Sequence, residues 1–174
     1  MPRHAKTPQD VKAEDLPYRP CVGIMLINAD GLIWVGNRIQ EVDTGSPLTW
    51  QMPQGGIDEG EDAATAALRE LKEETGTDKA NILGETADWL HYDLPEHLIG
   101  VALKGKFRGQ AQKWFAMRFT GKDGDIDIAA DEHQEFSEWA WVPIDELVDL
   151  IVPFKRNVYE RVIAELGKYA VPAG

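Results

Sequence analysis

Three glutamates stand close together in the stretch from Gly55 to Thr77, GGIDEGEDAATAALRELKEETGT. If this stretch is helical, Glu70, Glu73 and Glu74 fall within an arc of about 100°, because each residue advances the helix by roughly 100°. Ionised carboxylates placed so closely repel one another. A divalent cation reverses that cost. Mg²⁺ takes hard oxygen ligands and often shares its shell with substrate phosphates, so it suits the three glutamates better than zinc does. The stretch is therefore a candidate metal site for phosphate chemistry.

The residues around the glutamates predict a helix that begins near Asp62. Glu61 and Asp62 follow Gly60 and place negative charge where the helix dipole favours it. Gly76 supplies a stop after the last turn. Four apolar residues recur with helical spacing and predict a buried stripe beside the glutamates: Ala64, Ala67, Leu68 and Leu71. The preceding segment, Gln54-Gly55-Gly56, is expected to form a turn that needs backbone conformations unfavourable for residues with a Cβ.

A glutamate-rich helix is often only a solvated face, here with Arg69 and Lys72 as ion-pair partners. The complete spacing argues for more. It reads Gly55, five residues, Glu61, seven residues, Arg69-Glu70-Leu71, one residue, Glu73-Glu74, one residue, Gly76. This pattern resembles the Nudix box of the nucleoside diphosphate-linked hydrolases. Leu71 aside, the pattern has seven fixed identities at fixed spacing, which arise by chance on the order of once in a million chains of this size.

The resemblance implies a role for each residue of the pattern. Glu70, Glu73 and Glu74 would bind metal, Glu74 is also a candidate to activate the attacking water, and Arg69 would orient the carboxylates. The box turn and its ends would be built by Gly55, Gly56, Glu61 and Gly76. The implied chemistry is hydrolysis of a phosphoric anhydride with Mg²⁺, Mn²⁺ or another divalent cation. The implied fold is α/β, a Nudix α/β/α sandwich with a mixed central sheet. Thr77 departs from the pattern, since the family usually has an aliphatic residue there.

The similarity extends over nearly all of Tyr18–Leu166. Six segments resemble the branch of the family that contains RNA pyrophosphohydrolases and dinucleoside tetraphosphate hydrolases: YRPCVGIMLIN, WQMPQGGIDEGED, WLHYDLP, GQAQKWF, EFSEWAWV and PFKRNVY. In this branch a further metal ligand lies outside the box, and the matching residue here is Glu135. Its alternative role is that of an ordinary turn carboxylate.

Five residues outside the box are candidates for substrate binding, each with a structural alternative. Lys113 follows two glutamines and could hold a phosphate, or be a strand-edge lysine. Phe154 and Lys155 precede the predicted last helix, where an aromatic ring could stack on a base and a cation could hold its phosphate, although Phe154 could equally anchor that helix. Arg38 resembles a base-facing arginine or is a surface residue of a strand. Tyr92 could stack on the second nucleoside of a dinucleotide or belong partly to the core.

Length and composition predict one compact domain. With 174 residues, of which 43% are hydrophobic, the chain can bury one sizeable core. We expect a loosely ordered N-terminal tail over residues 1–17 and a single Nudix hydrolase domain over residues 18–170. The single cysteine, Cys21, lies in a predicted strand and is a poor candidate nucleophile. The low cysteine content and the absence of a leader-like or membrane-spanning run favour a cytoplasmic location.

The net charge of −12 argues against binding of duplex DNA, because such binding depends on lysine and arginine. A polyanionic substrate must therefore meet local cations or metal. Eight cations are candidates: Arg19, Arg38, Lys104, Lys106, Arg108, Lys113, Lys155 and Arg156.

The remaining elements follow from periodicity and turn signals. Strands are predicted at Cys21–Asn28, Leu32–Ile39, Ile82–Tyr92, Lys113–Thr120 and Phe136–Val142, and helices at Asp145–Leu150 and Arg156–Leu166.

Three functions remain open at this point. The first is removal of pyrophosphate from the 5′ triphosphate end of RNA, and the second is asymmetric hydrolysis of diadenosine tetraphosphate to ATP and AMP. The third is a nucleotide-binding module without hydrolysis, which the complete acidic set argues against. The segment Pro95–Arg108 could clamp a second nucleotide or admit an RNA strand. No feature of the sequence indicates a protein partner.

Overall fold

The central strand, β1 (Tyr18–Ile27), is rich in β-branched and other apolar residues, and its last seven positions are buried. The computed structural model describes residues 12–40 and 43–174. Most of the predicted tail, residues 1–17, therefore lies outside the described residues, and residues 13–15 form a short 3-10 turn. Strand β2 (Ile33–Arg38) pairs with β1 in antiparallel fashion, and the turn between them contains Asp30-Gly31, a dipeptide typical of hairpins.

Eight strands form one sheet in the described part of the chain. Besides β1 and β2 they are β3 (Trp50–Gln51), β4 (Gln54–Gly56), β5 (Ala80–Glu85), β6 (Leu90–Asp93), β7 (Gly109–Phe119) and β8 (Phe136–Val142). The α-helices described are α1 (Ala63–Thr75), α2 (Leu147–Leu150) and α3 (Arg156–Leu166). Short 3-10 turns lie between them, including η3 (Glu96–Leu98) and η4 (Leu103–Gly105).

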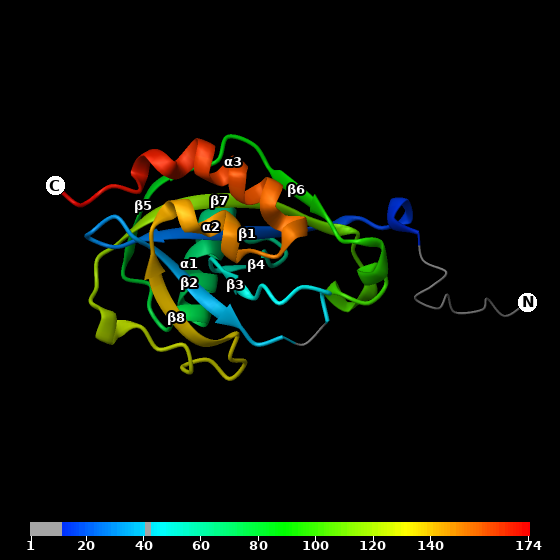
Figure 1. Cartoon of the computed structure of the whole chain (residues 1–174), viewed down its shortest axis with the longest axis horizontal. Coiled ribbons are helices and arrows are strands. Elements are labelled where there is room, and N and C mark those ends of the chain that lie inside the picture. The colour runs from blue at the N-terminus through cyan, green and yellow to red at the C-terminus, as the bar shows by residue number, and fades with distance from the viewer. Residues whose placement is uncertain (1–11, 41–42) are drawn as a thin grey trace, which may run out of the picture.

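The sheet is mixed. Strands β1 and β7 run parallel, with Tyr18 opposite Gly109 and Ile27 opposite Arg118. The other strand pairs are antiparallel. Helix α1 covers one face of the sheet, while α2 and α3 cover the other (Figure 1). This is the α/β/α arrangement with a mixed central sheet that the family resemblance implies.

Alternation along β1 builds a separate hydrophobic core on each face, because successive side chains of a strand point to opposite sides. Val22 and Ile24 pack with Ala67 and Leu71 of α1. The intervening residues of the strand pack on the other face. That second core combines residues of β1, α2 and α3, among them Met25, Ile27, Leu147, Val158 and Val162.

Helix α1 begins and ends where the sequence predicts. Asp62 is its N-cap, and the Asp62 carboxylate accepts a hydrogen bond from the backbone N–H of Thr65 at 3.2 Å. Gly76 ends the helix in the left-handed conformation, with φ of 81°. The hydroxyl of the atypical Thr77 is buried but satisfied, since it accepts a hydrogen bond from the backbone N–H of Lys79 at 3.1 Å.

Two strand predictions need correction. The predicted strand Ile82–Tyr92 is two strands, because β5 and β6 pair with different halves of β7. Between them the hydroxyl of Thr86, not a backbone group, accepts from the N–H of Trp114 at 3.2 Å. Strand β7 also begins four residues before the predicted Lys113, because residues 109–112 already pair with the start of β1. The predicted helix Asp145–Leu150 is a 3-10 turn followed by the single turn α2.

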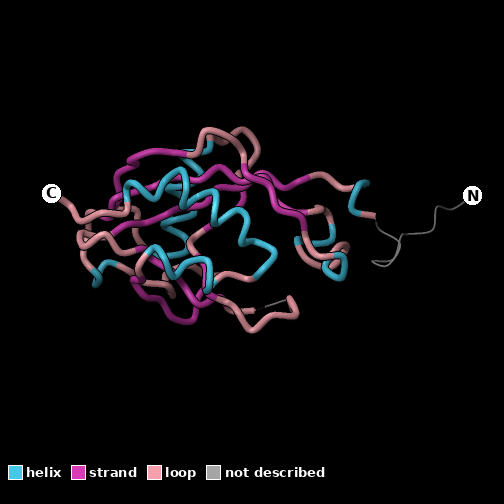
Figure 2. Tube along the Cα trace, turned by 45° about the horizontal axis from the view of Figure 1, so that its top comes forward, coloured by secondary structure: helices cyan, strands magenta, loops and turns pink. Residues whose placement is uncertain are grey.

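The connection between β6 and β7 lies beyond the end of the sheet at which β1 begins. Figure 1 shows this connection in green on the right-hand side, and Figure 2 shows the same connection from another angle. It contains η3 and η4. The start of α3 faces the same end of the molecule (Figure 1). These segments surround the cavities described below.

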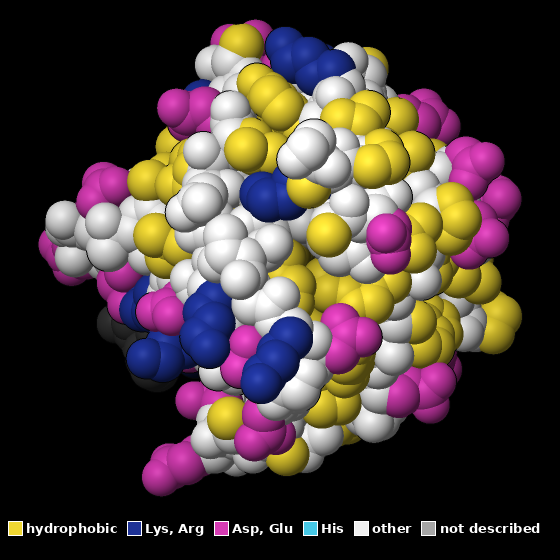
Figure 3. All heavy atoms as spheres, turned by 90° about the vertical axis from the view of Figure 1, so that its left-hand side faces the viewer, with side chains coloured by type: hydrophobic (Ala, Val, Ile, Leu, Met, Phe, Trp, Pro, Cys, Tyr) yellow, Lys and Arg dark blue, Asp and Glu magenta, His cyan; other side chains and the backbone are white. Residues whose placement is uncertain are grey.

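The opposite end of the molecule, which carries the C-terminus, has acidic and basic side chains interspersed across its surface (Figure 3). It presents no continuous basic face of the kind that duplex nucleic acid requires. Among the described residues, none of the helices is both long and apolar enough to cross a bilayer.

Candidate functional site

The two glycines of the box are required by close packing, which corrects the predicted turn. Residues Gln54–Gly56 form strand β4, antiparallel to β1, and neither glycine has a positive φ. A Cβ on Gly55 would lie 2.1 Å from the carboxylate carbon of Glu70, and one on Gly56 would lie 2.4 Å from Nη2 of Arg19. The glycines therefore let the side chains of Glu70 and Arg19 approach the strand.

Replacing Gly55 with alanine is expected to lower kcat/KM about tenfold, because the new methyl group displaces the Glu70 carboxylate. The end of a glutamate side chain can move aside, so we expect the midpoint of thermal unfolding to change by no more than about 2–4 °C. Steady-state kinetics and a thermal melt check both values. Gly124→Ala is the matched control, since nothing lies within 4 Å of its new Cβ. Equal activities of the two variants would contradict this role of Gly55.

Arg69 ties the carboxylates of the box together. Its Nε and Nη2 donate to the two oxygens of Glu61 at 2.8 and 2.9 Å. Its Nη1 donates to Glu70 at 3.0 Å and to Glu73 at 3.1 Å, and Nη2 also donates to the carbonyl of Gly56 at 2.8 Å. The hydrogen bonds from Arg69 lower the pKa of Glu61 to about 2. This geometry fits the orienting role that the resemblance implies.

The glutamates of α1 differ in burial. Glu74 is only 5% exposed, and its Oε2 accepts from the backbone N–H of Gln54 at 3.3 Å. Burial, followed by repulsion from Glu70 and Glu135, raises the pKa of Glu74 well above the usual value. Burial and the charge of Glu73 raise the pKa of Glu70 to about 7. Two carboxyls that are buried and repelled in this way are suited to a nearby cation.

Glu135 lies just before β8 and completes an acidic cavity of about 300 Å³ with the three glutamates of α1. Asp131 and His133 line the same cavity, and Nε2 of His133 is 3.3 Å from Oε1 of Glu135. The donors are hard oxygens, which fit Mg²⁺. In the described residues no group of three such side chains is already arranged around one point as a metal site. Arg69 contacts Oε1 of Glu70 and Oε1 of Glu73, which leaves Oε2 of each carboxylate for a cation.

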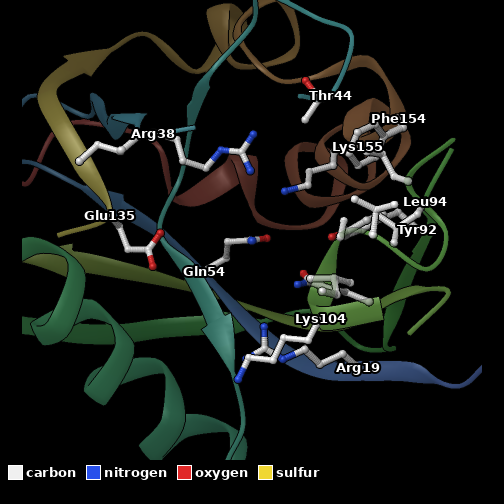
Figure 4. A pocket seen from close by; sticks show the side chains of 16 residues that line it. Arg19, Arg38, Thr44, Gln54, Tyr92, Leu94, Lys104, Glu135, Phe154 and Lys155 are labelled. Atoms are coloured by element: carbon white, nitrogen blue, oxygen red, sulfur yellow. The ribbon is translucent and has the colours of Figure 1, made fainter. Parts of the chain in front are cut away.

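A second cavity of about 420 Å³, here called the cationic cavity, adjoins the acidic one (Figure 4). The two cavities share Arg19, Arg38, Gln54, Leu103, Gln110 and Glu135. Lys104 and Lys155 add positive charge to the cationic cavity. Tyr92 and Phe154 add aromatic surface, with ring centroids 5.7 Å apart. A phosphate group held by the cations would therefore lie next to the glutamates.

Lys155 is buried at the start of α3, with 5% of its surface exposed. Its Nζ lies 5.4 Å from the ring centroid of Tyr92, and no acceptor of the described residues binds it. Burial and the nearby charge of Arg38 lower the pKa of Lys155 to about 7. Nε of Arg38 is likewise buried without a hydrogen-bond partner among the described residues. An unsatisfied buried donor such as Nε of Arg38 is costly, and an anion in the cavity would satisfy it.

Hydrogen bonds among three glutamines fix the orientation of their side-chain amides. Nε2 of Gln112 donates to the side-chain oxygens of Gln54 and Gln110, both at 2.7 Å. The oxygen of Gln112 in turn accepts from Nε1 of Trp114 at 2.8 Å. Because their oxygens are engaged, Gln54 and Gln110 have their amide N–H groups available to the cavities that they line.

Lys113 does not reach either cavity. Strand alternation places Lys113 on the face of β7 opposite to that of Gln110 and Gln112. Its Nζ donates to the carbonyl of Ala87 at 3.3 Å and lies 3.8 Å from Glu85. The structure therefore gives no support to the predicted phosphate contact.

The sequence did not reveal the apolar wall of the cationic cavity, formed by Leu94, Leu98, Val101, Ala102 and Leu103. These residues belong to a segment without a strand or helix pattern, so no periodicity identifies them. Asp131 and His133 were also missed as cavity residues. The two-residue spacing of Asp131, His133 and Glu135 is a signal that could have found them.

Comparison with known proteins shows which family and which relatives the chain resembles. Residues 17–162 match the family described as NUDIX domain. A protein of Rhodospirillum rubrum named RNA pyrophosphohydrolase is 60% identical over 167 residues, covering 95% of this chain and 98% of that protein. A protein of the same name from Agrobacterium fabrum is 58% identical over 161 residues, covering 89% of this chain and 95% of its own length.

Solved structures confirm the fold. The E. coli dihydroneopterin triphosphate pyrophosphohydrolase superposes with a TM-score of 0.61 and 18% identity, covering 86% of this chain and 99% of that one. A C. elegans Ap4A hydrolase binary complex gives a TM-score of 0.59 and 19% identity, covering 86% and 98%. At these identities the likeness concerns the α/β/α architecture alone.

Proposed function

Because this chain belongs to the NUDIX domain family, we propose that it is a metal-dependent hydrolase that removes pyrophosphate from the 5′ triphosphate end of RNA. The product is RNA with a 5′ monophosphate. Relatives that are 52–60% identical over nearly their whole length bear the name RNA pyrophosphohydrolase. Identity at this level supports a shared reaction.

The observation that carries the proposal is the junction of the two cavities. The acidic cavity contains Glu70, Glu73, Glu74 and Glu135, and it opens into the cationic cavity through the side chains that both share. A triphosphate held in the cationic cavity would present an anhydride bond to the glutamates. Phe154 is only half-buried and can stack on a base, whereas Tyr92 is 5% exposed and offers little ring surface to a second nucleoside. This difference favours RNA over diadenosine tetraphosphate.

The four glutamates would hold Mg²⁺, with Mn²⁺ or another divalent cation as a substitute, because hard oxygen donors suit these ions. When bound, the cation neutralises phosphate charge and makes water a better nucleophile. Arg69 keeps Glu70 and Glu73 in place. The protein thus supplies the cation site and its orientation.

Glu74 is the proposed general base. Its Oε2 is engaged by the N–H of Gln54, so Oε1 takes the proton of the attacking water. The water oxygen bonds to phosphorus, the anhydride between the α- and β-phosphates breaks, and pyrophosphate departs. Lys155 and Arg38 hold the phosphates during this step.

A cytoplasmic location and the domain limits 18–170 remain predictions.

Incubation of 5′-triphosphorylated RNA with the protein and Mg²⁺ tests the proposal, with the products separated by chromatography. We expect pyrophosphate and 5′-monophosphorylated RNA in equal amounts, and no reaction in excess chelator. Release of orthophosphate only, or the same rate with chelator, would contradict the proposal. Binding of the RNA without any turnover would instead support a nucleotide-binding module.

Replacing Lys155 with methionine is expected to raise KM for triphosphorylated RNA about tenfold, since a charge-assisted phosphate contact is lost. The same change should stabilise the protein. The pKa of Lys155 is about 7 in the folded protein and about 10.5 in the unfolded chain. Between these two pH values Lys155 must therefore lose its proton when the protein folds. The stabilisation should therefore be fully present below pH 7 and vanish above about pH 10.5.

Thermal melts across pH and steady-state kinetics check the two effects of Lys155→Met. Lys168→Met is the control, because Lys168 is exposed and lies outside both cavities. If Lys155→Met left KM unchanged, Lys155 would not bind phosphate.

A further inference from the structure

The connection between β6 and β7 contains a tight turn with unfavourable backbone geometry. Leu103 and Lys104 have φ of 55° and 59°, and they are the only residues other than glycine with a positive φ in the described chain. Residues with a Cβ rarely adopt this conformation. Gly100 and Gly105 flank the turn, also with positive φ, and a Cβ on Gly105 would lie 2.8 Å from the carbonyl oxygen of Gly100. The turn is closely packed and strained.

This turn distinguishes three cations that the sequence leaves equivalent. Arg108 is engaged by Asp93 at 2.8 Å and lies over the ring of Tyr18. Lys106 is exposed and lines neither cavity. Only Lys104, inside the strained turn, lines the cationic cavity. Strained backbone that persists at a cavity is a reason to suspect a functional role.

Lys104 shares the cationic cavity with another cation, Arg19. In the view of Figure 4, Lys104 and Arg19 are in the lower part of the cavity, and Lys155 and Arg38 are in the upper part. No carboxylate of the described residues forms an ion pair with Lys104 or Arg19. Like charges that line one cavity repel each other unless an anion lies among them. The pair is therefore suited to a ligand with several negative charges.

From this arrangement we infer that Lys104 is a polyphosphate-binding residue, held over the cavity by the strained turn and acting together with Arg19. The inference rests on the proposed function, and it identifies the ligand as a chain of three phosphates. Lys155 and Arg38 bind from one side of the cavity, and Lys104 and Arg19 bind from the other. A chain of three phosphates offers more anionic oxygens to the two pairs than a monophosphate does. The product should therefore bind more weakly than the substrate.

Kinetics of Lys104→Ala test the inference with triphosphorylated RNA. We expect KM to rise about tenfold with kcat nearly unchanged, because a charged contact formed before the reaction is lost. Lys104→Arg should restore most of the affinity. Lys106→Ala, two residues away in the same connection, is the matched control and should behave as the unmutated protein. If Lys104→Ala and Lys106→Ala had the same KM, the inference would be wrong.

Binding of inorganic tripolyphosphate, measured by calorimetry, separates this inference from the proposed function. If the unmutated protein binds tripolyphosphate more tightly than Lys104→Ala does, Lys104 is a phosphate ligand even if RNA is not hydrolysed. If RNA is hydrolysed but the two proteins bind tripolyphosphate equally, the proposed function holds and the inference fails.

The strain itself is tested by comparing glycine with alanine at two positions. Both Lys104→Gly and Lys104→Ala remove the cation, but glycine tolerates the positive φ. We expect the glycine variant to melt about 2–4 °C higher than the alanine variant. At Lys106, where φ is −101°, glycine should give no such gain over alanine. Equal melting of the two Lys104 variants would show that the turn is not strained.

Discussion

Glu74→Gln is expected to lower kcat by a factor of about 10²–10⁴ while the fold is retained. Glutamine keeps the size of the side chain and can still accept from the N–H of Gln54, but it cannot take a proton from water or ligate a cation as a carboxylate does. Circular dichroism and kinetics on triphosphorylated RNA test this expectation. Glu160→Gln, an exposed change on α3, is the control. Near-normal turnover of Glu74→Gln would refute the role of Glu74.

The same substitution should stabilise the metal-free protein. A carboxyl whose pKa is raised on folding binds a proton in the folded state, so stability falls as pH rises from about 4.3 through the folded pKa. Glutamine removes this loss. In chelator at pH 8, the variant should melt about 2–4 °C above the unmutated protein, and the gain should vanish below about pH 4. A lower melting temperature in chelator would contradict the charge repulsion inferred for the site.

Arg69→Met is expected to lower both activity and stability. Removing the guanidinium leaves Glu61, Glu70 and Glu73 without their shared donor, and all three repel one another. We expect kcat/KM to fall about 100-fold, because the metal ligands lose their orientation. The free energy of unfolding should fall by about 2 kcal/mol, less than for a fully buried pair because the Arg69 side chain is 28% exposed.

Arg161→Met is the matched control for Arg69. Arg161 lies on α3, is 59% exposed and has a single pair with Glu165 at 3.5 Å, so its loss should cost less than about 0.5 kcal/mol. Urea unfolding and kinetics compare the two variants. Added Mg²⁺ should recover part of the stability of Arg69→Met, since the cation replaces the missing positive charge. Equal stability of the two variants would contradict the central position of Arg69.

The sequence predicted best the elements whose signals are local. Asp62 and Gly76 bound α1 as predicted, and the predicted limits of β8 and α3 agree with the structure. The structural role of Gly55 and Gly56 could not be predicted from local signals. Their small size serves contacts with Glu70 and Arg19, which come from other elements. A local sequence cannot distinguish a glycine needed for space from one needed for a turn.

The choice among the cations also depended on distant parts of the chain. Lys113 and Gln112 are neighbours in sequence, but alternation in β7 sends them to opposite faces, and only its register with β1 and β6 decides which face holds the site. Lys104 reaches the cavity because Leu103 and Lys104 adopt the left-handed conformation, which the sequence does not predict. The predicted cation list was therefore too broad, although it contained Arg19, Arg38, Lys104 and Lys155.

The most direct test of the proposed function compares kcat/KM for 5′-triphosphorylated RNA and for diadenosine tetraphosphate in one Mg²⁺ buffer. Glu74→Gln protein, purified in the same way, controls for contaminating activity. We expect the RNA to be preferred by about tenfold or more, which corresponds to roughly 1.4 kcal/mol of transition-state stabilisation. Faster hydrolysis of diadenosine tetraphosphate would contradict the account and assign the cationic cavity to a second nucleoside.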